Sequence, residues 1–185
     1  MEVNALDHLA EHLELGVAKC LPPVSDPGQR MHRHLLIATD GSEMSRVAIL
    51  YGIALAKSVG AQATAITVMP SHKFALAAGW LMDTAKDHHQ RMGLLAEQYL
   101  SVVRDAALAA GIECELVHRE HDQPYQAIID VAREKFCDLI IMASHGRRGV
   151  SAVVLGSETL KVLTYSSIPV LVYRAPRHES FFVPS

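Results

Sequence analysis

The sequence has little of what marks several specialised classes of protein. None of its apolar runs approaches the ~18 to 20 residues of a transmembrane helix, and Glu2, Asp7 and Glu11 stand where a signal peptide would carry basic residues. Its three cysteines are widely spaced, which fits neither a disulfide framework nor a CxxC zinc site. We therefore expect a cytoplasmic protein with reduced thiols and no membrane partner.

Charge of one sign is not in excess either. The 17 basic and 20 acidic residues give a net charge of −3, and the longest basic block is Arg147-Arg148. A protein that binds duplex nucleic acid normally carries a basic patch, so no nucleic-acid partner is expected. The 11 histidines are predicted to be mostly solvated, and no metal ion is expected to be held by protein ligands.

The 185 residues are enough for one domain with extensions. An apolar stripe at 5–18 predicts an amphipathic helix, and three prolines at 21–28 predict a linker, so residues 1–33 form an N-terminal arm. The helix at 5–18 could pack within the same subunit, cross to a partner subunit or bind another protein. Residues 34–174 form the domain, and 175–185 form a polar tail.

Short apolar runs alternate with helical stretches from His34 onward. The predicted strands cover 35–39, 63–68, 112–117, 138–143 and 170–173. One predicted helix follows Ser42 and ends near Gly60, and others cover 83–110, with Leu108 on its core face, 124–136 and 157–165; residues 69–81 form a connecting segment. This alternation predicts a doubly wound α/β fold with a five-stranded parallel sheet and helices on both faces.

Ligands of such sheets bind at the carboxyl ends of the strands. The first predicted strand ends at Asp40-Gly41-Ser42, and the fourth leads into a loop that ends at Gly156-Ser157 and opens a helix. A helix N-terminus favours an anion such as a phosphate, although the glycines could also be simple turn and cap residues. The GxxxxGK[ST] and GxGxxG phosphate motifs are both absent.

These strand ends resemble those of the universal stress protein family. The resemblance covers about 34–174 and rests on Asp40-Gly41-Ser42, Ser144-His145-Gly146, Gly156-Ser157 and the terminal strand Ile168–Val172. The family's nucleotide-binding branch is marked by G-x2-G-x9-G-[ST], which Gly146, Gly156 and Ser157 match, with Ala143 in place of the first glycine. An alanine is compatible with this position if it does not need a positive φ.

The resemblance implies a site for ATP, AMP or ADP, with Mg²⁺ or Mn²⁺ carried on the phosphates. Asp40 would face the ribose or adenine, unless it only forms an Asx-type turn, and Ser157 would either donate to a phosphate or cap the last helix. The Glu158 carboxylate would repel a triphosphate, which the cation would offset. Arg147 could pair with a phosphate or be a solvated loop residue, and His145 is similarly open. The candidate nucleotide-binding residues are Ala38, Thr39, Asp40, Val68, Met142, Ala143, His145, Gly146, Arg147, Gly149, Gly156, Ser157, Glu158 and Thr159.

The expected function is an ATP-binding regulatory module of the stress response without strong catalytic activity. No GxSxG motif or other recognisable nucleophile arrangement is present. Two alternatives remain open: a nucleotide-free protein-interaction module of the same fold, and a slow ATPase or phosphotransferase. The resemblance also implies a homodimer, formed through the apolar strand at 168–174 if it lies at a sheet edge.

Overall fold

The computed structural model describes residues 31–79, 84–146 and 155–174. Four sequence predictions lie outside these ranges: the helix at 5–18, the tail at 175–185, and the candidate site residues Arg147 and Gly149. The contacts between residues separate the chain into two compact units, Met1–Met31 and His32–Ser185, and the fold belongs to the second unit.

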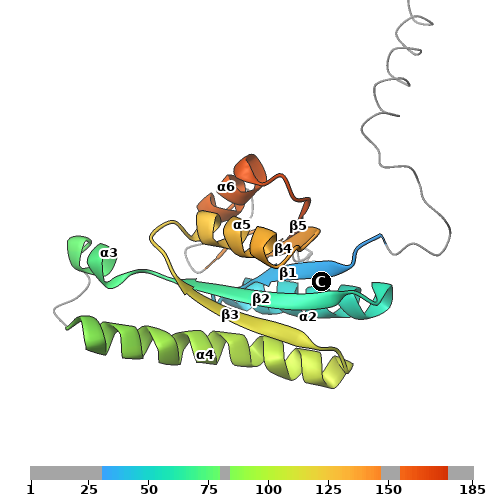
Figure 1. Cartoon of the computed structure of the whole chain (residues 1–185), viewed down its shortest axis with the longest axis horizontal. Helices are drawn as coiled ribbons and strands as arrows, with labels where there is room; N and C mark the ends of the chain where they lie inside the picture. Colours follow the sequence, from blue (N-terminus) through green and yellow to red (C-terminus); the bar gives the residue numbers. More distant parts are fainter. Residues whose placement is uncertain (1–30, 80–83, 147–154, 175–185) are drawn as a thin grey trace, which may run out of the picture. The chain divides into compact units, whose positions relative to one another are not determined.

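Five parallel strands form one sheet in the order β3-β2-β1-β4-β5 (Figure 1). The strands are β1 (His34–Ala38), β2 (Gln62–Met69), β3 (Cys114–Glu120), β4 (Leu139–Ala143) and β5 (Val170–Tyr173). The helices are α2 (Glu43–Val59), α3 (His72–Ala77), α4 (Ala85–Ala110), α5 (Pro124–Glu134) and α6 (Ser157–Tyr165). The predicted doubly wound fold is confirmed.

Two apolar layers hold the helices against the sheet. Leu35 and Ile37 of β1 pack with α2 and α4 on one face, while Leu36 and Ala38 pack with α5 and α6 on the other. Because successive side chains of a strand point to opposite faces, a central strand covered on both sides must be apolar at every position. This explains why β1 reads as an unbroken apolar run in the sequence.

Helix ends follow the local signals that the sequence carries. The Ser42 hydroxyl caps α2 by accepting from the Ser45 N–H at 3.2 Å, and Gly60 ends the helix with a φ of 65°. Glycine adopts this left-handed conformation at little cost in free energy, so helices often end at a glycine. The bounds of α6 and β5 also agree with the sequence prediction.

Three features differ clearly from the sequence prediction, and several ends shift by one or two residues, such as the start of β3 at Cys114 and the end of α5 at Glu134. The segment at 69–81 contains a helix, α3, whose N-cap Ser71 accepts from the Phe74 N–H. Strand β3 runs to Glu120 rather than 117, because it pairs with β2 along its whole length. Leu108 is 72% exposed, and the buried positions of α4 are His88, Ala96, Leu100, Val103 and Ala107.

No helix within the described ranges is both long and apolar enough to cross a membrane.

Candidate functional site

The strand order places a switch point, named the β1–β4 crevice here, at the carboxyl ends of the neighbouring strands β1 and β4. From β1 the chain continues to β2, toward one edge of the sheet, and from β4 it continues to β5, toward the other edge. The connections that leave these two neighbouring strands therefore run in opposite directions. This is the switch point at which open α/β sheets bind their ligands. The residues at its rim are those that follow β1, from Thr39, and those that follow β4, from Ser144.

Asp40 and Gly146 meet across this crevice. A Cβ built on Gly146 would run into the Asp40 carboxylate, so the glycine leaves the space that this side chain occupies. Asp40 Oδ1 also accepts from the Ser42 N–H at 3.0 Å. The Asp40 side chain therefore forms an Asx turn and also lies at the rim of the crevice.

The other predicted residues after β1 are mainly buried. Thr39 is 6% exposed; its hydroxyl lies 3.0 Å from that of Ser45 and accepts from the Gly41 N–H at 3.3 Å. Its side chain therefore holds the turn in shape. Ala38 is the last residue of β1 and is likewise buried.

Val68 lies near the carboxyl end of β2, two residues beyond the last pairing with β1. The Ile66 carbonyl accepts from the Thr39 N–H, and the Met69 carbonyl accepts from the His121 N–H on the β3 side. Because backbone groups alternate in direction along a strand, the N–H and C=O of Val68 point to the same side as those of Ile66. They face the crevice beyond the end of β1.

Two of the predicted site residues, Met142 and Ala143, lie at the end of β4, and both are buried. Phe136 alone among the described non-glycine residues has a positive φ, so the backbone of Ala143 does not demand glycine. An alanine at the first glycine position of the motif therefore carries no conformational strain here.

The first turn of α6 is joined to the end of β4 by two hydrogen bonds. Gly156 is the N-cap and its N–H donates to the Ser144 carbonyl at 2.8 Å, while the Thr159 hydroxyl donates to the Ala143 carbonyl at 3.0 Å. Ser157 is the first helical residue, with no side-chain cap bond at this helix end, and it is exposed. Its hydroxyl is thus not the helix cap that the sequence allowed.

Glu158 is turned toward α5. Its Oε2 accepts from the Tyr125 N–H at 3.0 Å, and its Oε1 accepts from Lys161 Nζ at 2.8 Å. The sequence suggested a carboxylate that repels a phosphate; in the structure this carboxylate has two donors of its own.

His145 pairs with Ser144, which sequence reasoning did not foresee. The Ser144 hydroxyl lies 3.0 Å from His145 Nδ1, and His145 Nε2 is buried without a hydrogen-bond partner among the described residues. Ser144 itself is fully buried. The adjacent positions in the sequence could have suggested the contact, but only the fold shows that it is inside the protein.

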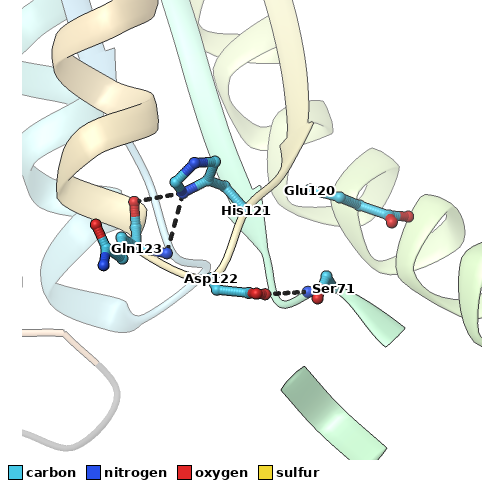
Figure 2. Close-up of a pocket in the computed structure, with 5 residues that line it drawn as sticks. All are labelled: Ser71, Glu120, His121, Asp122 and Gln123. Carbon is cyan, nitrogen blue, oxygen red and sulfur yellow. Dashed lines mark hydrogen bonds between the residues drawn. The ribbon is translucent and has the colours of Figure 1, made fainter. Parts of the chain in front are cut away.

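A hollow lies at the same edge of the sheet, beside the ends of β2 and β3 (Figure 2). It has a volume of about 430 Å³ and is lined by polar residues. Asp122 closes one side by accepting from the Ser71 N–H at 3.3 Å. The lining residues are Ser71, Glu120, His121, Asp122 and Gln123. If the sequence analysis had extended β3 to Glu120, it would have placed Glu120 and Asp122 at the carboxyl edge of the sheet.

No group of three histidine, cysteine or carboxylate side chains suited to a metal ion occurs within the described ranges.

Together, the sheet and its strand order define a doubly wound α/β protein with its switch point between β1 and β4. The sequence model of the universal stress protein family matches residues 31–174. The chain belongs to this family. A universal stress protein of Methanocaldococcus jannaschii is 29% identical over 155 residues, which cover 82% of this chain and 88% of that protein.

Solved structures share the same fold. A universal stress protein in complex with cAMP gives a TM-score of 0.60 at 21% identity, over 78% of this chain and 99% of the other. A universal stress protein from Archaeoglobus fulgidus in complex with dAMP gives a TM-score of 0.52 at 17% identity, over 79% of this chain and 100% of the other.

Proposed function

We propose that this chain binds an adenine nucleotide, ATP, ADP or AMP, across the carboxyl ends of β1 and β4 and acts as a regulatory module of the stress response. The observation that carries the proposal is the meeting of Asp40 and Gly146 at the switch point, next to the start of α6. The relatives solved with cAMP and dAMP support an adenine nucleotide as the class of ligand.

The phosphates would lie at the first turn of α6. Free N–H groups of a helix N-terminus favour an anion, and the exposed Ser157 hydroxyl adds a donor. Thr159 contributes by fixing this turn to β4, since its own hydroxyl is already engaged. Arg147 and Gly149, outside the described ranges, remain part of the proposed site, as does His145.

The nucleoside would lie over β1 and β2. The Asp40 carboxylate can accept from ribose hydroxyls, and the Val68 N–H and C=O, which face the crevice, can bond the edge of an adenine. Ala38, Met142 and Ala143 would form the wall at the strand ends. Mg²⁺ or Mn²⁺ would be held by the phosphates of the nucleotide, consistent with the donors that already occupy Glu158.

The proposal is tested by calorimetric titration of nucleotide-free protein with ATP, ADP, AMP and adenosine, with and without Mg²⁺. We expect Ser157→Ala to weaken ATP binding about tenfold and to leave adenosine binding unchanged, because one phosphate donor is lost. Asp40→Asn keeps an oxygen that can accept from the Ser42 N–H, and it should weaken the binding of both ATP and adenosine. Ser101→Ala, on the exposed side of α4, is the matched control.

Absence of binding at about 1 mM ATP, which corresponds to only about 4 kcal/mol, would overturn the proposal and favour a nucleotide-free interaction module. Steady release of phosphate above a protein-free control would instead favour the slow ATPase or phosphotransferase.

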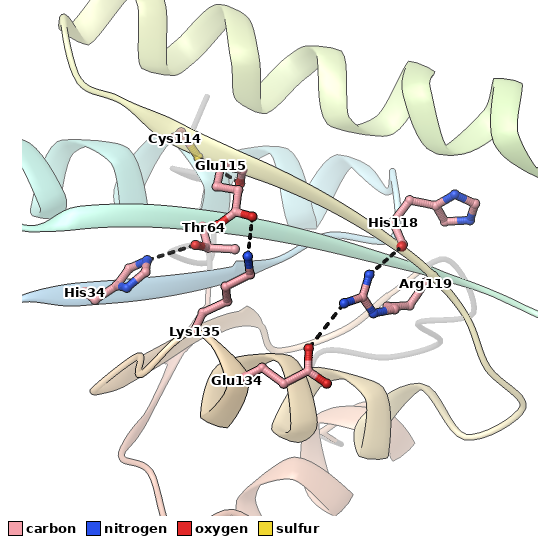
Figure 3. A network of polar contacts seen from close by, with 8 residues as sticks. All are labelled: His34, Thr64, Cys114, Glu115, His118, Arg119, Glu134 and Lys135. Atoms are coloured by element: carbon pink, nitrogen blue, oxygen red, sulfur yellow. Dashed lines mark hydrogen bonds and ion pairs between the residues drawn. The ribbon is translucent and has the colours of Figure 1, made fainter.

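We also propose that two copies pair through β5. This strand forms one edge of the sheet and is apolar, whereas the opposite edge strand, β3, carries ion pairs to the end of α5 (Figure 3). Arg119 Nη2 lies 3.2 Å from Glu134 Oε2, and Lys135 pairs with Glu115. Charged side chains protect an edge strand from pairing, and among the described residues β5 is the edge without such ion pairs.

A proline tests this pairing directly. The carbonyls of Pro169 and Tyr173 accept from the N–H groups of Ile140 and Ser144 on the β4 side. Because backbone groups alternate in direction along a strand, the N–H of Val172 points to the open edge. Val172→Pro removes that donor without removing a β4–β5 bond, and we expect a monomer in sedimentation experiments. Thr164→Ala on the exposed side of α6 is the control; an unchanged dimer in the proline variant would place the interface elsewhere.

A further inference from the structure

The start of α5 has no cap of its own. Its N-cap residue, Gln123, makes no side-chain cap bond, and Pro124 follows as the first helical residue. The next N–H, that of Tyr125, is one of the donors that a helix start leaves without a partner inside the helix. Such a donor is stabilised by an acceptor from elsewhere in the protein.

Glu158 supplies that acceptor from another helix. Its Oε2 lies 3.0 Å from the Tyr125 nitrogen, across a sequence separation of 33 residues. Glu158 is also in the first turn of α6, so one carboxylate lies at the N-terminal ends of two helices. The positive ends of both helix dipoles favour a negative charge there.

Lys161 and two tyrosines complete the contact between the helices. Lys161 Nζ donates to Glu158 Oε1 at 2.8 Å and lies 5.3 Å from the centre of the Tyr125 ring. The hydrogen bond to Glu158 is the main cause of the raised pKa of Lys161. The rings of Tyr125 and Tyr165 are 5.4 Å apart, so both ends of α6 contact α5.

We propose that Glu158 is a positioning residue for the nucleotide: it caps α5 and thereby fixes the first turn of α6, with Ser157, in the orientation that receives phosphate. This inference rests on the proposed nucleotide binding. It reverses the role expected from the sequence, in which the carboxylate faces the phosphates and opposes them. For this role the acceptor oxygen contributes more than the negative charge, which the two helix dipoles also favour.

Two substitutions separate these roles. Glu158→Gln keeps an oxygen that can accept from Tyr125, whereas Glu158→Ala removes it. We expect Glu158→Ala to weaken ATP binding about tenfold and to speed hydrogen exchange of the Tyr125 amide, and Glu158→Gln to restore both to within about twofold of the wild type. Glu97→Gln, which removes a carboxylate charge from α4, is the control.

Opposite results would overturn the inference. If both substitutions tighten ATP binding, and the gain disappears at high salt, Glu158 faces the phosphates and its charge opposes them. Unchanged exchange at Tyr125 in Glu158→Ala would show that the carboxylate does not cap α5 in solution. A wild-type protein that fails to bind ATP overturns the proposed function before any variant is made, and the positioning role with it, while exchange at Tyr125 still reports separately on the cap.

Discussion

The carboxylate of Asp40 occupies the space that a side chain on Gly146 would need. These two residues follow strands that are 105 positions apart in the sequence at their starts, His34 and Leu139, and that become neighbours only in the folded sheet. The glycine is therefore needed at this point for the room that it leaves to a charged side chain of another strand. Its φ is not positive, so the backbone does not require it.

Gly146→Ala is expected to weaken ATP binding about tenfold, because the added methyl group displaces the Asp40 carboxylate from the crevice. Stability should change little, since a side-chain end can move aside. Gly93→Ala is the matched control: a methyl group there meets nothing within 4 Å, and the change should stabilise the helix by about 0.5 to 1 kcal/mol. Equal affinities of wild type and Gly146→Ala would contradict the proposed place of Asp40 in the site.

Gly41→Ala should destabilise the protein by more than about 2 kcal/mol. Gly41 has a φ of 77°, and a Cβ there would overlap the ring of Tyr99, so conformational strain and overpacking combine. Gly111→Ala separates the two causes, because its φ is 70° but nothing lies within 4 Å, and it should cost only about 1 kcal/mol. Urea denaturation of both variants measures the difference, and similar losses would show that Tyr99 moves aside freely.

Cys114 and Cys137 should be unreactive thiols in the folded protein. Burial raises the pKa of Cys137 to about 12 and that of Cys114 to about 11. The thiolate is the nucleophile, so a disulfide reagent at pH 8 should modify neither residue until the protein unfolds. A Cys20→Ser variant leaves only these two thiols for the measurement. One equivalent of fast-reacting thiol without urea would contradict this expectation.

His118 should make the fold less stable in acid. Burial lowers its pKa below the ordinary value of 6.5, an effect that the neighbouring Glu120 partly offsets and His89 reinforces. The unfolded chain therefore takes up the proton first, and the free energy of unfolding falls as the pH drops below about 6.5. His118→Gln has no proton to take up, so its urea midpoint should fall less than that of the wild type between pH 7.5 and 5.5. Parallel curves would mean that other groups cause the loss.

Local signals predicted most of the fold. The unbroken apolar run of β1 indicated a strand covered on both faces, and Ser42 and Gly60 marked the two ends of α2. Because parallel strands present their carboxyl ends at one edge, the residues that follow β1 and β4 could be placed in one crevice from the sequence alone.

The misplaced features depend on contacts between distant segments. Leu108 was misplaced on α4 because it is large and apolar, while the buried positions include Ala96 and Ala107, whose small side chains let the helix approach the sheet. The partners of Glu158 and Thr159 are 33 and 16 residues away, so neither the cap of α5 nor the bond to β4 leaves a local pattern.

The unequal edges of the sheet limit how far strands can be added. Pairing of β5 with β5 from a second copy would join two sheets and leave only β3 at both outer margins. There the ion pairs of Glu115 and Arg119 discourage a further strand. Growth along the sheet would therefore stop at two copies, and a protein with an apolar edge strand would avoid extension into a fibre.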